Sequence, residues 1–178
     1  VVAYQTAYLK TYYPVEFMAA LMTSVVDNTD KVAGYIYACR QMNIQMLPPD
    51  VNTSDMEFSV EDNAIRFGLS AVKSLGRTTI KAIIDERNKS RFTSMQDFIS
   101  RLYTDLNKRT LENLIKSGAF DTLGNNRRQM MSVYVRMLDN EATLGKDAIS
   151  GQMSPFHLVD ESEQSPFEIK MQDVSVYI

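Results

Sequence analysis

The stretch LSAVKSLGRTTIKAII, from Leu69 to Ile84, decides the fold. Its apolar residues recur at helical spacing on both sides of a short turn that ends at Gly76, and such spacing is typical of amphipathic helices. The apolar residues are Leu69 and Val72 before the turn and Ile80, Ile83 and Ile84 after it. The stretch therefore predicts two helices joined by a tight turn, which is the pattern of a helix-hairpin-helix.

The turn has the chemistry of a phosphate-binding site. Gly76 lets backbone N–H groups approach an anion closely, and the helix after it presents its positive N-terminus to the same anion. Lys73, Arg77 and Lys81 add positive charge. Ser74 stands where the usual turn has its first glycine; its hydroxyl can donate to a phosphate, but serine adopts positive φ less readily. We expect this turn to bind duplex DNA through phosphates, without reading the base sequence.

A second turn, with the sequence LIKSG at Leu114–Gly118, repeats these residue types after another apolar helical pattern. A tandem pair of hairpins would contact two successive stretches of phosphates. The alternative is a purely structural helical bundle in which both glycines end helices. The remaining candidate DNA-binding residues are Lys108, Arg109, Lys116, Ser117 and Gly118.

The distribution of charge favours the DNA-binding interpretation. The formal net charge is -3, but residues 64–130 carry thirteen basic and six acidic side chains, a net charge of +7. Residues 1–63 and 131–178 each carry three basic and eight acidic side chains, a net charge of -5. A cationic block within an acidic chain is typical of a module that binds a polyanion. A merely solvated helical surface, the alternative, would mix both signs throughout.

The rest of the chain predicts a mainly α fold, a helical bundle with a small β-hairpin and the tandem helix-hairpin-helix. Pro14, Asn28, Ser94 and Asn107 mark helix starts, and Ser94 with Asp97 resembles a capping box. Alternating residues on both sides of an Asp-Asn turn at 62–63 predict the hairpin. We expect three regions: helices at 1–55, the β-hairpin and tandem motif at 56–142, and a flexible polar tail at 143–178.

Several classes of function are excluded. Cys39 and His157 are the sole residues of their types, so the chain can form neither an internal disulfide nor a zinc site of the Cys/His kind. We expect Cys39 to be buried. The single thiol also fits a cytoplasmic location. An apolar run of about 18 residues, which a membrane span requires, is absent. Closely spaced aspartates for a two-metal site are also absent. We therefore expect no catalytic residue, no metal site and no cofactor in this chain.

Longer stretches of sequence carry a resemblance to a known family. The stretches AYQTAYLK at 3–10, YPVEFMAAL at 13–21 and IKSGAFD at 115–121 are similar to bacterial DNA polymerase III alpha subunits, the replicative C-family polymerases. The resemblance covers about residues 1–130. It implies that residues 1–55 are distal fingers and that the tandem motif contacts duplex DNA. It also implies a longer parent enzyme that extends DNA with magnesium and palm aspartates, within the polymerase III holoenzyme.

The tail contains a stretch that resembles the clamp-binding peptide of this family. In the family, a Gln is followed by small or polar residues and then by Leu-Phe or a similar pair. Gln can bond at the rim of a pocket that the apolar pair fills, although proline stands here where leucine is usual. An inert linker is the alternative. The candidate residues for binding the sliding clamp are Gln152, Met153, Ser154, Pro155 and Phe156.

Three interpretations of the whole chain remain open. The first is a non-catalytic segment of a replicative DNA polymerase that binds the DNA backbone and tethers the enzyme to its sliding clamp. The second is a stand-alone helix-hairpin-helix DNA-binding module. The third is a structural scaffold, which a salt-dependent duplex-binding assay would separate from the other two.

Overall fold

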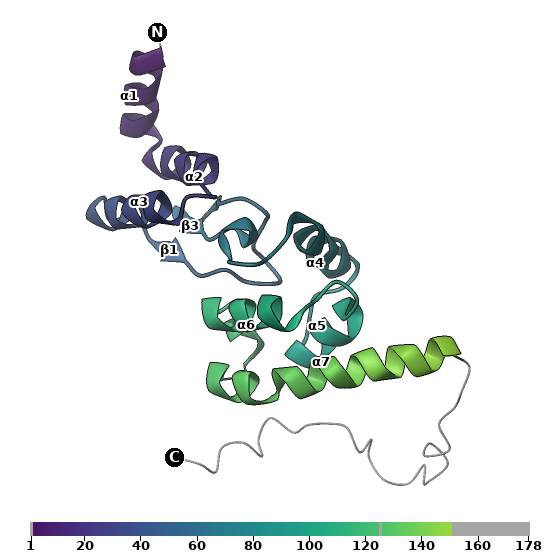
Figure 1. Cartoon of the computed structure of the whole chain (residues 1–178). Helices are drawn as coiled ribbons and strands as arrows, with labels where there is room; N and C mark the ends of the chain where they lie inside the picture. Colours follow the sequence, from purple (N-terminus) through teal and green to yellow (C-terminus); the bar gives the residue numbers. More distant parts are fainter. Residues whose placement is uncertain (1, 125, 151–178) are drawn as a thin grey trace.

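The computed structural model describes residues 2–124 and 126–150, and it is mainly helical, as predicted (Figure 1). The described α-helices are α1 Val2–Tyr12, α2 Pro14–Ser24, α3 Thr29–Gln41, α4 Arg77–Lys89, α5 Met95–Leu102, α6 Lys108–Ser117 and α7 Arg127–Ser150. Two 3-10 turns, η1 Leu69–Ala71 and η2 Asp121–Leu123, and three short strands complete the described elements. None of the described helices is long and apolar enough to cross a membrane.

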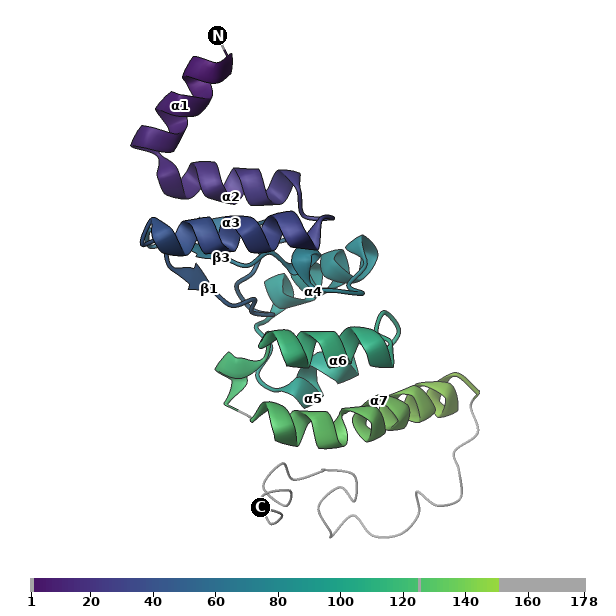
Figure 2. The same cartoon turned by 60° about the vertical axis from the view of Figure 1, so that its left-hand side comes forward.

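Helices α2 and α3 begin where the sequence predicts. Pro14 occupies the first turn of α2, where its missing N–H costs no hydrogen bond. The Asn28 side chain accepts a hydrogen bond from the Lys31 N–H at 3.0 Å and so caps α3. Met22 and Cys39 are fully buried between these helices and the sheet, which confirms the expectation for the cysteine. Helix α1 buries none of its residues and extends away from the rest of the molecule in both views (Figures 1 and 2).

The predicted β-hairpin is present as β2 (Ser59–Glu61) and β3 (Ala64–Arg66), which are antiparallel. Asp62 and Asn63 both have positive φ in the turn between them, a conformation that these two residue types tolerate well. A third strand, β1 (Met46–Leu47), pairs in parallel with β3, and the strand order is β1-β3-β2. Sequence periodicity missed β1 because two residues show no alternation.

Buried residues form two clusters that divide the described chain. The first cluster joins α2 and α3 to the sheet through Phe58 and Ile65. The second runs from Val51 and Leu69 to Leu138 and contains the buried faces of α4, α5, α6 and α7. The buried residues of the sheet therefore pack with the N-terminal helices, and the four later helices build the core of the helix-hairpin-helix region.

The segment before the first hairpin differs from the prediction. Residues 69–71 form one turn of 3-10 helix instead of an α-helix. The N–H groups of Leu69 and Ser70 donate to the carbonyls of Asp55 and Met56. The turn ends at Val72, whose ψ of 123° is extended, so it does not continue as a helix. At the other end, α7 continues to Ser150 and passes the expected end of the motif at residue 142. A single glycine within a helix costs only about 1 kcal/mol relative to alanine, so Gly145 does not stop it.

Candidate nucleic-acid interface

The first hairpin turn adopts the geometry that its sequence requires. Ser74 has a φ of 63°, so it takes up the left-handed conformation that a glycine would adopt more easily. The turn closes with a hydrogen bond from the Leu75 N–H to the Val72 carbonyl at 3.3 Å. Gly76 then precedes α4 with φ -74° and ψ 153°, and it supplies no capping side chain. The first N–H groups of α4 therefore have no side-chain acceptor from the capping residue, which leaves the positive end of this helix open to an anion.

Helix α6 holds the hairpin turn in place. The Thr110 hydroxyl donates to the Ser74 carbonyl at 2.9 Å, and the Asn113 amide donates to the Lys73 carbonyl at 2.8 Å. The Thr79 hydroxyl of α4 donates to the Asp105 carbonyl, just before α6, at 3.1 Å. These hydrogen bonds hold the hairpin turn against α6 and the start of α4 against the loop that precedes α6.

This packing brings together candidates that are far apart in the sequence. Lys73 and Arg77 belong to the hairpin, and Lys108 and Arg109 are the first two residues of α6. The Asn107 side chain caps α6 by accepting from the Thr110 N–H at 2.8 Å. Arg109 is exposed, whereas the Lys108 ammonium pairs with Asp139 of α7 at 2.9 Å.

The second predicted turn has a different environment. Gly118 ends α6 with a φ of 89°, and it is buried. The Arg127 guanidinium lies over it, donating to Asp121 at 2.8 Å and to the Lys116 carbonyl at 3.3 Å. Lys116 itself pairs with Glu112, and the Ser117 hydroxyl donates to the Leu114 carbonyl at 2.9 Å. The second turn is thus covered by side chains of the chain itself, unlike the first.

Sequence reasoning missed Gly124, which, like Gly76, follows a leucine and precedes a long helix, although its backbone is left-handed and that of Gly76 is not. Gly118 is followed by the 3-10 turn η2, and the next long helix, α7, starts only after Gly124. Gly124 has a φ of 81°, and a Cβ there would meet nothing within 4 Å. In the sequence, a Leu-Gly pair followed by polar residues marks the approach to α4 and to α7 alike.

The structure divides the basic block into two groups. Seven of the thirteen basic side chains pair with carboxylates, and Arg87 and Arg101 also bond backbone carbonyls, with Arg101 lying 4.5 Å from the centre of the Phe92 ring. The other six are exposed and pair with no carboxylate of the described residues. These six are Lys73, Arg77, Lys81, Arg91, Arg109 and Arg128. Lys73 and Arg77 belong to the first hairpin, and Arg109 directly precedes Thr110, which bonds the hairpin turn.

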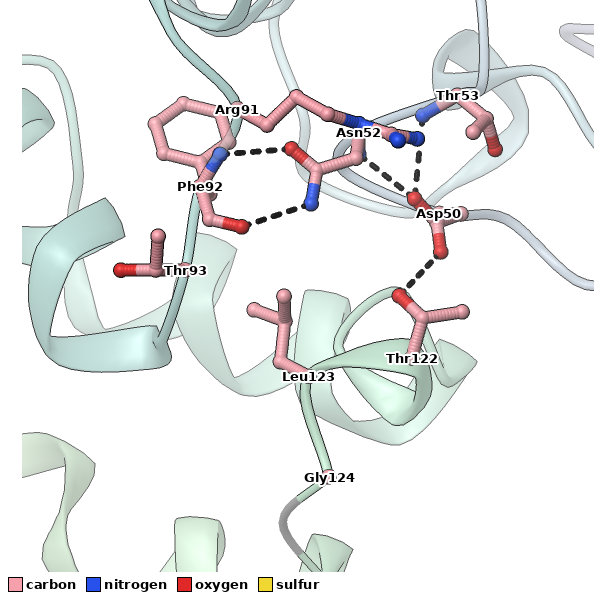
Figure 3. A pocket seen from close by; sticks show the side chains of 9 residues that line it. All are labelled: Asp50, Asn52, Thr53, Arg91, Phe92, Thr93, Thr122, Leu123 and Gly124. Carbon is pink, nitrogen blue, oxygen red and sulfur yellow. Dashed lines mark hydrogen bonds between the residues drawn. The ribbon is translucent and has the colours of Figure 1, made fainter.

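An open pocket of about 670 Å³ lies beside Gly124 (Figure 3). The Asp50 carboxylate accepts from the N–H groups of Asn52 and Thr53, at 2.7 and 3.1 Å, and from the Thr122 hydroxyl at 2.5 Å. The Asn52 side chain bonds both the N–H and the carbonyl of Phe92. These hydrogen bonds tie the loop at 50–53 to η2 and to the chain that precedes α5.

The ionisable groups with shifted pKa values lie away from the first hairpin. Hydrogen bonds from Lys89 and Arg101 lower the pKa of Glu86, and a hydrogen bond from Arg127 lowers that of Asp121. Burial raises the pKa of the Cys39 thiol. Within residues 2–124 and 126–144, no group of three or more His, Cys, Asp or Glu side chains could hold a metal ion.

Residues 43–130 match the family model described as a helix-hairpin-helix motif, which defines the class of this region. The chain is 44% identical over 157 residues to DNA polymerase III subunit alpha of Saccharopolyspora erythraea, covering 87% of this chain and 13% of that protein. It is 39% identical over 177 residues to the same subunit of Mycobacterium tuberculosis, covering 97% of this chain and 15% of that protein. It is 47% identical over 134 residues to the alpha subunit of Vibrio cholerae, covering 74% of this chain and 12% of that protein.

The chain belongs to the family of bacterial DNA polymerase III alpha subunits. It spans between 11% and 15% of the length of the curated relatives it matches. The resemblance to this family, and the presence of a helix-hairpin-helix motif in the region 43–130, are thereby confirmed.

Proposed function

We propose that this chain binds the phosphate backbone of duplex DNA, without sequence preference, as a non-catalytic segment of a replicative DNA polymerase. One observation carries the proposal. The hairpin turn that leads into the open N-terminus of α4 is bonded to α6, and Lys73 and Arg77 of the hairpin and Arg109 of α6 are exposed. Family membership adds support, because the matched relatives are named as polymerase subunits.

Two features of this surface favour phosphate binding: its positive side chains and the N–H groups at the start of α4. Helix N-termini attract anions because their first N–H groups lack acceptors and the helix dipole is positive there. Lysine and arginine side chains around such a terminus replace the counterions of the DNA backbone, so affinity falls steeply with salt. Interactions of this kind position a protein on the duplex but do not distinguish base pairs.

A charge-matched comparison tests the proposal. The triple variant Lys73→Ala, Arg77→Ala, Arg109→Ala removes three charges beside the hairpin, whereas Lys10→Ala, Lys31→Ala, Arg40→Ala removes three exposed charges from α1 and α3. We expect the first variant to bind a labelled duplex more weakly. The slope of log affinity against log salt should become shallower by about 0.9 for each phosphate that the variant no longer neutralises. We expect the second variant to bind like wild type.

Several outcomes would count against the proposal. Equal weakening by both triple variants would mean that net charge alone drives binding. Salt-insensitive binding, or no binding by the wild type, would favour the structural scaffold. Equal affinity for duplexes of unrelated sequence is expected throughout, and a strong preference for one sequence would contradict phosphate recognition.

We also propose the wider role that the family implies. The parent protein would be a magnesium-dependent DNA-directed DNA polymerase of the cytoplasmic replication holoenzyme, with its catalytic aspartates outside this chain. Residues 152–156 would bind the sliding clamp, with Phe156 as the apolar anchor and Gln152 as the polar contact. These residues lie outside the described part of the structure, and support for this role comes from their similarity to the clamp-binding peptide of the family.

A further inference from the structure

We propose that Thr110 and Asn113 of α6 are positioning residues for the DNA-contacting hairpin. They would hold the backbone of Lys73 and Ser74 in the one conformation that turns the Ser74 N–H toward a phosphate. The inference rests on the proposed function for its biological meaning, but the positioning itself can be measured without DNA.

The conformation of Ser74 is one that serine does not favour. Its φ of 63° lies in the left-handed region, where a Cβ crowds the following carbonyl and glycine is the usual residue. Such a conformation persists only where surrounding interactions enforce it. Here these interactions are the two hydrogen bonds from α6, at 2.9 Å to the Ser74 carbonyl and 2.8 Å to the Lys73 carbonyl.

These two hydrogen bonds also fix the direction of the N–H groups. In a planar trans peptide the C=O and the following N–H point in opposite directions. Because the Lys73 carbonyl points toward α6, the Ser74 N–H points away from α6. The Leu75 N–H is used within the turn, where it donates to the Val72 carbonyl. The Ser74 N–H bonds to no backbone or side-chain acceptor of the described residues, so it is available to an anion beside Lys73 and Arg77.

The Thr110 hydroxyl, like that of Thr79, bonds outside its own helix, which three other helical threonines do not. Thr6, Thr11 and Thr143 each donate to the carbonyl four residues earlier in their own helix, which is the common pattern for helical threonine. The Thr110 hydroxyl instead crosses to a segment 36 residues away, although the residue is only 2% exposed. A buried hydroxyl placed in this way has a structural partner, and that partner is the strained residue of the hairpin.

Three variants of the full chain separate positioning from simple stability. Thr110→Val removes the hydroxyl and keeps the shape, Thr110→Ser keeps the hydroxyl, and Thr11→Val removes an exposed hydroxyl from α1. We expect Thr110→Val to weaken duplex binding about fivefold, the factor that corresponds to the loss of one neutral hydrogen bond. We expect Thr110→Ser and Thr11→Val to stay within about twofold of wild type, since each keeps the hydrogen bond to Ser74. Asn113→Leu should weaken binding in the same direction as Thr110→Val.

A double-mutant cycle with Ser74→Gly gives the decisive result. Glycine adopts the left-handed conformation without help, so Thr110→Val should weaken binding less than about twofold in the Ser74→Gly background. Two sites that act independently would give the same fold-change in both backgrounds. Equal weakening in both backgrounds, or equal weakening by Thr110→Val and Thr110→Ser, would overturn the inference.

Amide hydrogen exchange without DNA distinguishes failure of this inference from failure of DNA binding. Thr110→Val should speed exchange at residues 72–77 while leaving α5 at its wild-type rate, and Ser74→Gly should remove that difference. If the wild type binds no duplex but exchange responds in this way, positioning holds and the proposed function fails. If exchange at residues 72–77 is unchanged in Thr110→Val, positioning fails whether or not the chain binds DNA.

Discussion

At the scale of single residues, Gly76 and Ser74 have different roles in the hairpin. Ser74 takes the left-handed conformation, while Gly76 has an ordinary φ of -74° that any residue can adopt. The conformation of Gly76 therefore does not require glycine. A Cβ added there would meet only the Thr78 hydroxyl, at 3.8 Å. What the missing side chain provides is open space next to the helix N-terminus, which is what close approach of a phosphate needs.

Gly76→Ala should separate binding from folding. We expect the free energy of unfolding to fall by no more than about 1 kcal/mol, because alanine is a poorer capping residue than glycine but meets no steric obstacle here. Duplex affinity should fall severalfold, because the methyl group occupies the space that a phosphate oxygen would enter. Urea unfolding and a duplex titration measure the two quantities. Unchanged affinity would show that phosphate does not approach at Gly76.

At Gly68, in contrast to Gly76, the fold has no room for a side chain. Its φ is ordinary, at -72°, but a Cβ there would lie 2.5 Å from the carbonyl carbon of Glu57. We expect Gly68→Ala to lower the free energy of unfolding by about 1–3 kcal/mol, because the backbone of the neighbouring segment must shift. Gly34→Ala is the control: nothing lies within 4 Å of a Cβ there, and alanine in a helix should stabilise by up to about 1 kcal/mol. Thermal unfolding that ranks the two variants equally would contradict the argument.

At the scale of elements, the sequence predicted the helices whose first turn is capped by the side chain of the residue before it. Ser94 accepts from the Asp97 N–H at 3.0 Å, and Asn107 caps α6, both as the sequence indicates. The arrangement of the candidate nucleic-acid interface could not be predicted from such local signals. The packing of α6 against the hairpin joins Asn113 to Lys73, forty residues apart, and periodicity carries no signal for such pairs. The covering of Gly118 by Arg127 likewise depends on tertiary structure, and it is why the second turn differs from the repeat that its residue types suggest.

The ion pair between Asp121 and Arg127 links η2 to the start of α7 and should make this junction sensitive to acid. The pair lowers the pKa of the Asp121 carboxyl, so the folded chain binds that proton more weakly than the unfolded chain. The pair therefore stabilises the fold above the ordinary aspartate pKa of about 4, and this contribution is lost as the pH falls through the lowered pKa.

Asp121→Asn should remove this contribution. We expect the free energy of unfolding at pH 7 to fall by up to about 1 kcal/mol, because both side chains are partly exposed to solvent. The difference from wild type should disappear by about pH 2, where the wild-type carboxyl is also neutral. Urea unfolding followed by circular dichroism from pH 7 to about pH 2 measures it. Asp27→Asn, at an exposed position, is the control, and a constant difference for Asp121→Asn at all pH values would contradict the ion-pair explanation.

At the scale of the whole molecule, charge and packing divide the chain at a similar place. The first core cluster lies mainly within residues 15–65, where the net charge of residues 1–63 is -5. The second cluster builds the part with a net charge of +7 at residues 64–130. The acidic part would be repelled by DNA while the basic part is attracted. This separation favours one orientation of the chain on a duplex, with α4 and α6 toward the phosphates.

The tail supplies the last prediction, on binding to the sliding clamp. In a titration of labelled peptide 148–160 against the clamp of the same organism, we expect Phe156→Ala to cost about 2 kcal/mol or more, because it truncates the buried anchor. Gln152→Ala should cost about 1 kcal/mol, for one neutral hydrogen bond. Pro155→Leu should tighten binding, because leucine fills an apolar pocket better. If Phe156→Ala binds like wild type, or Pro155→Leu weakens binding, residues 152–156 are a linker and the chain contributes DNA binding alone.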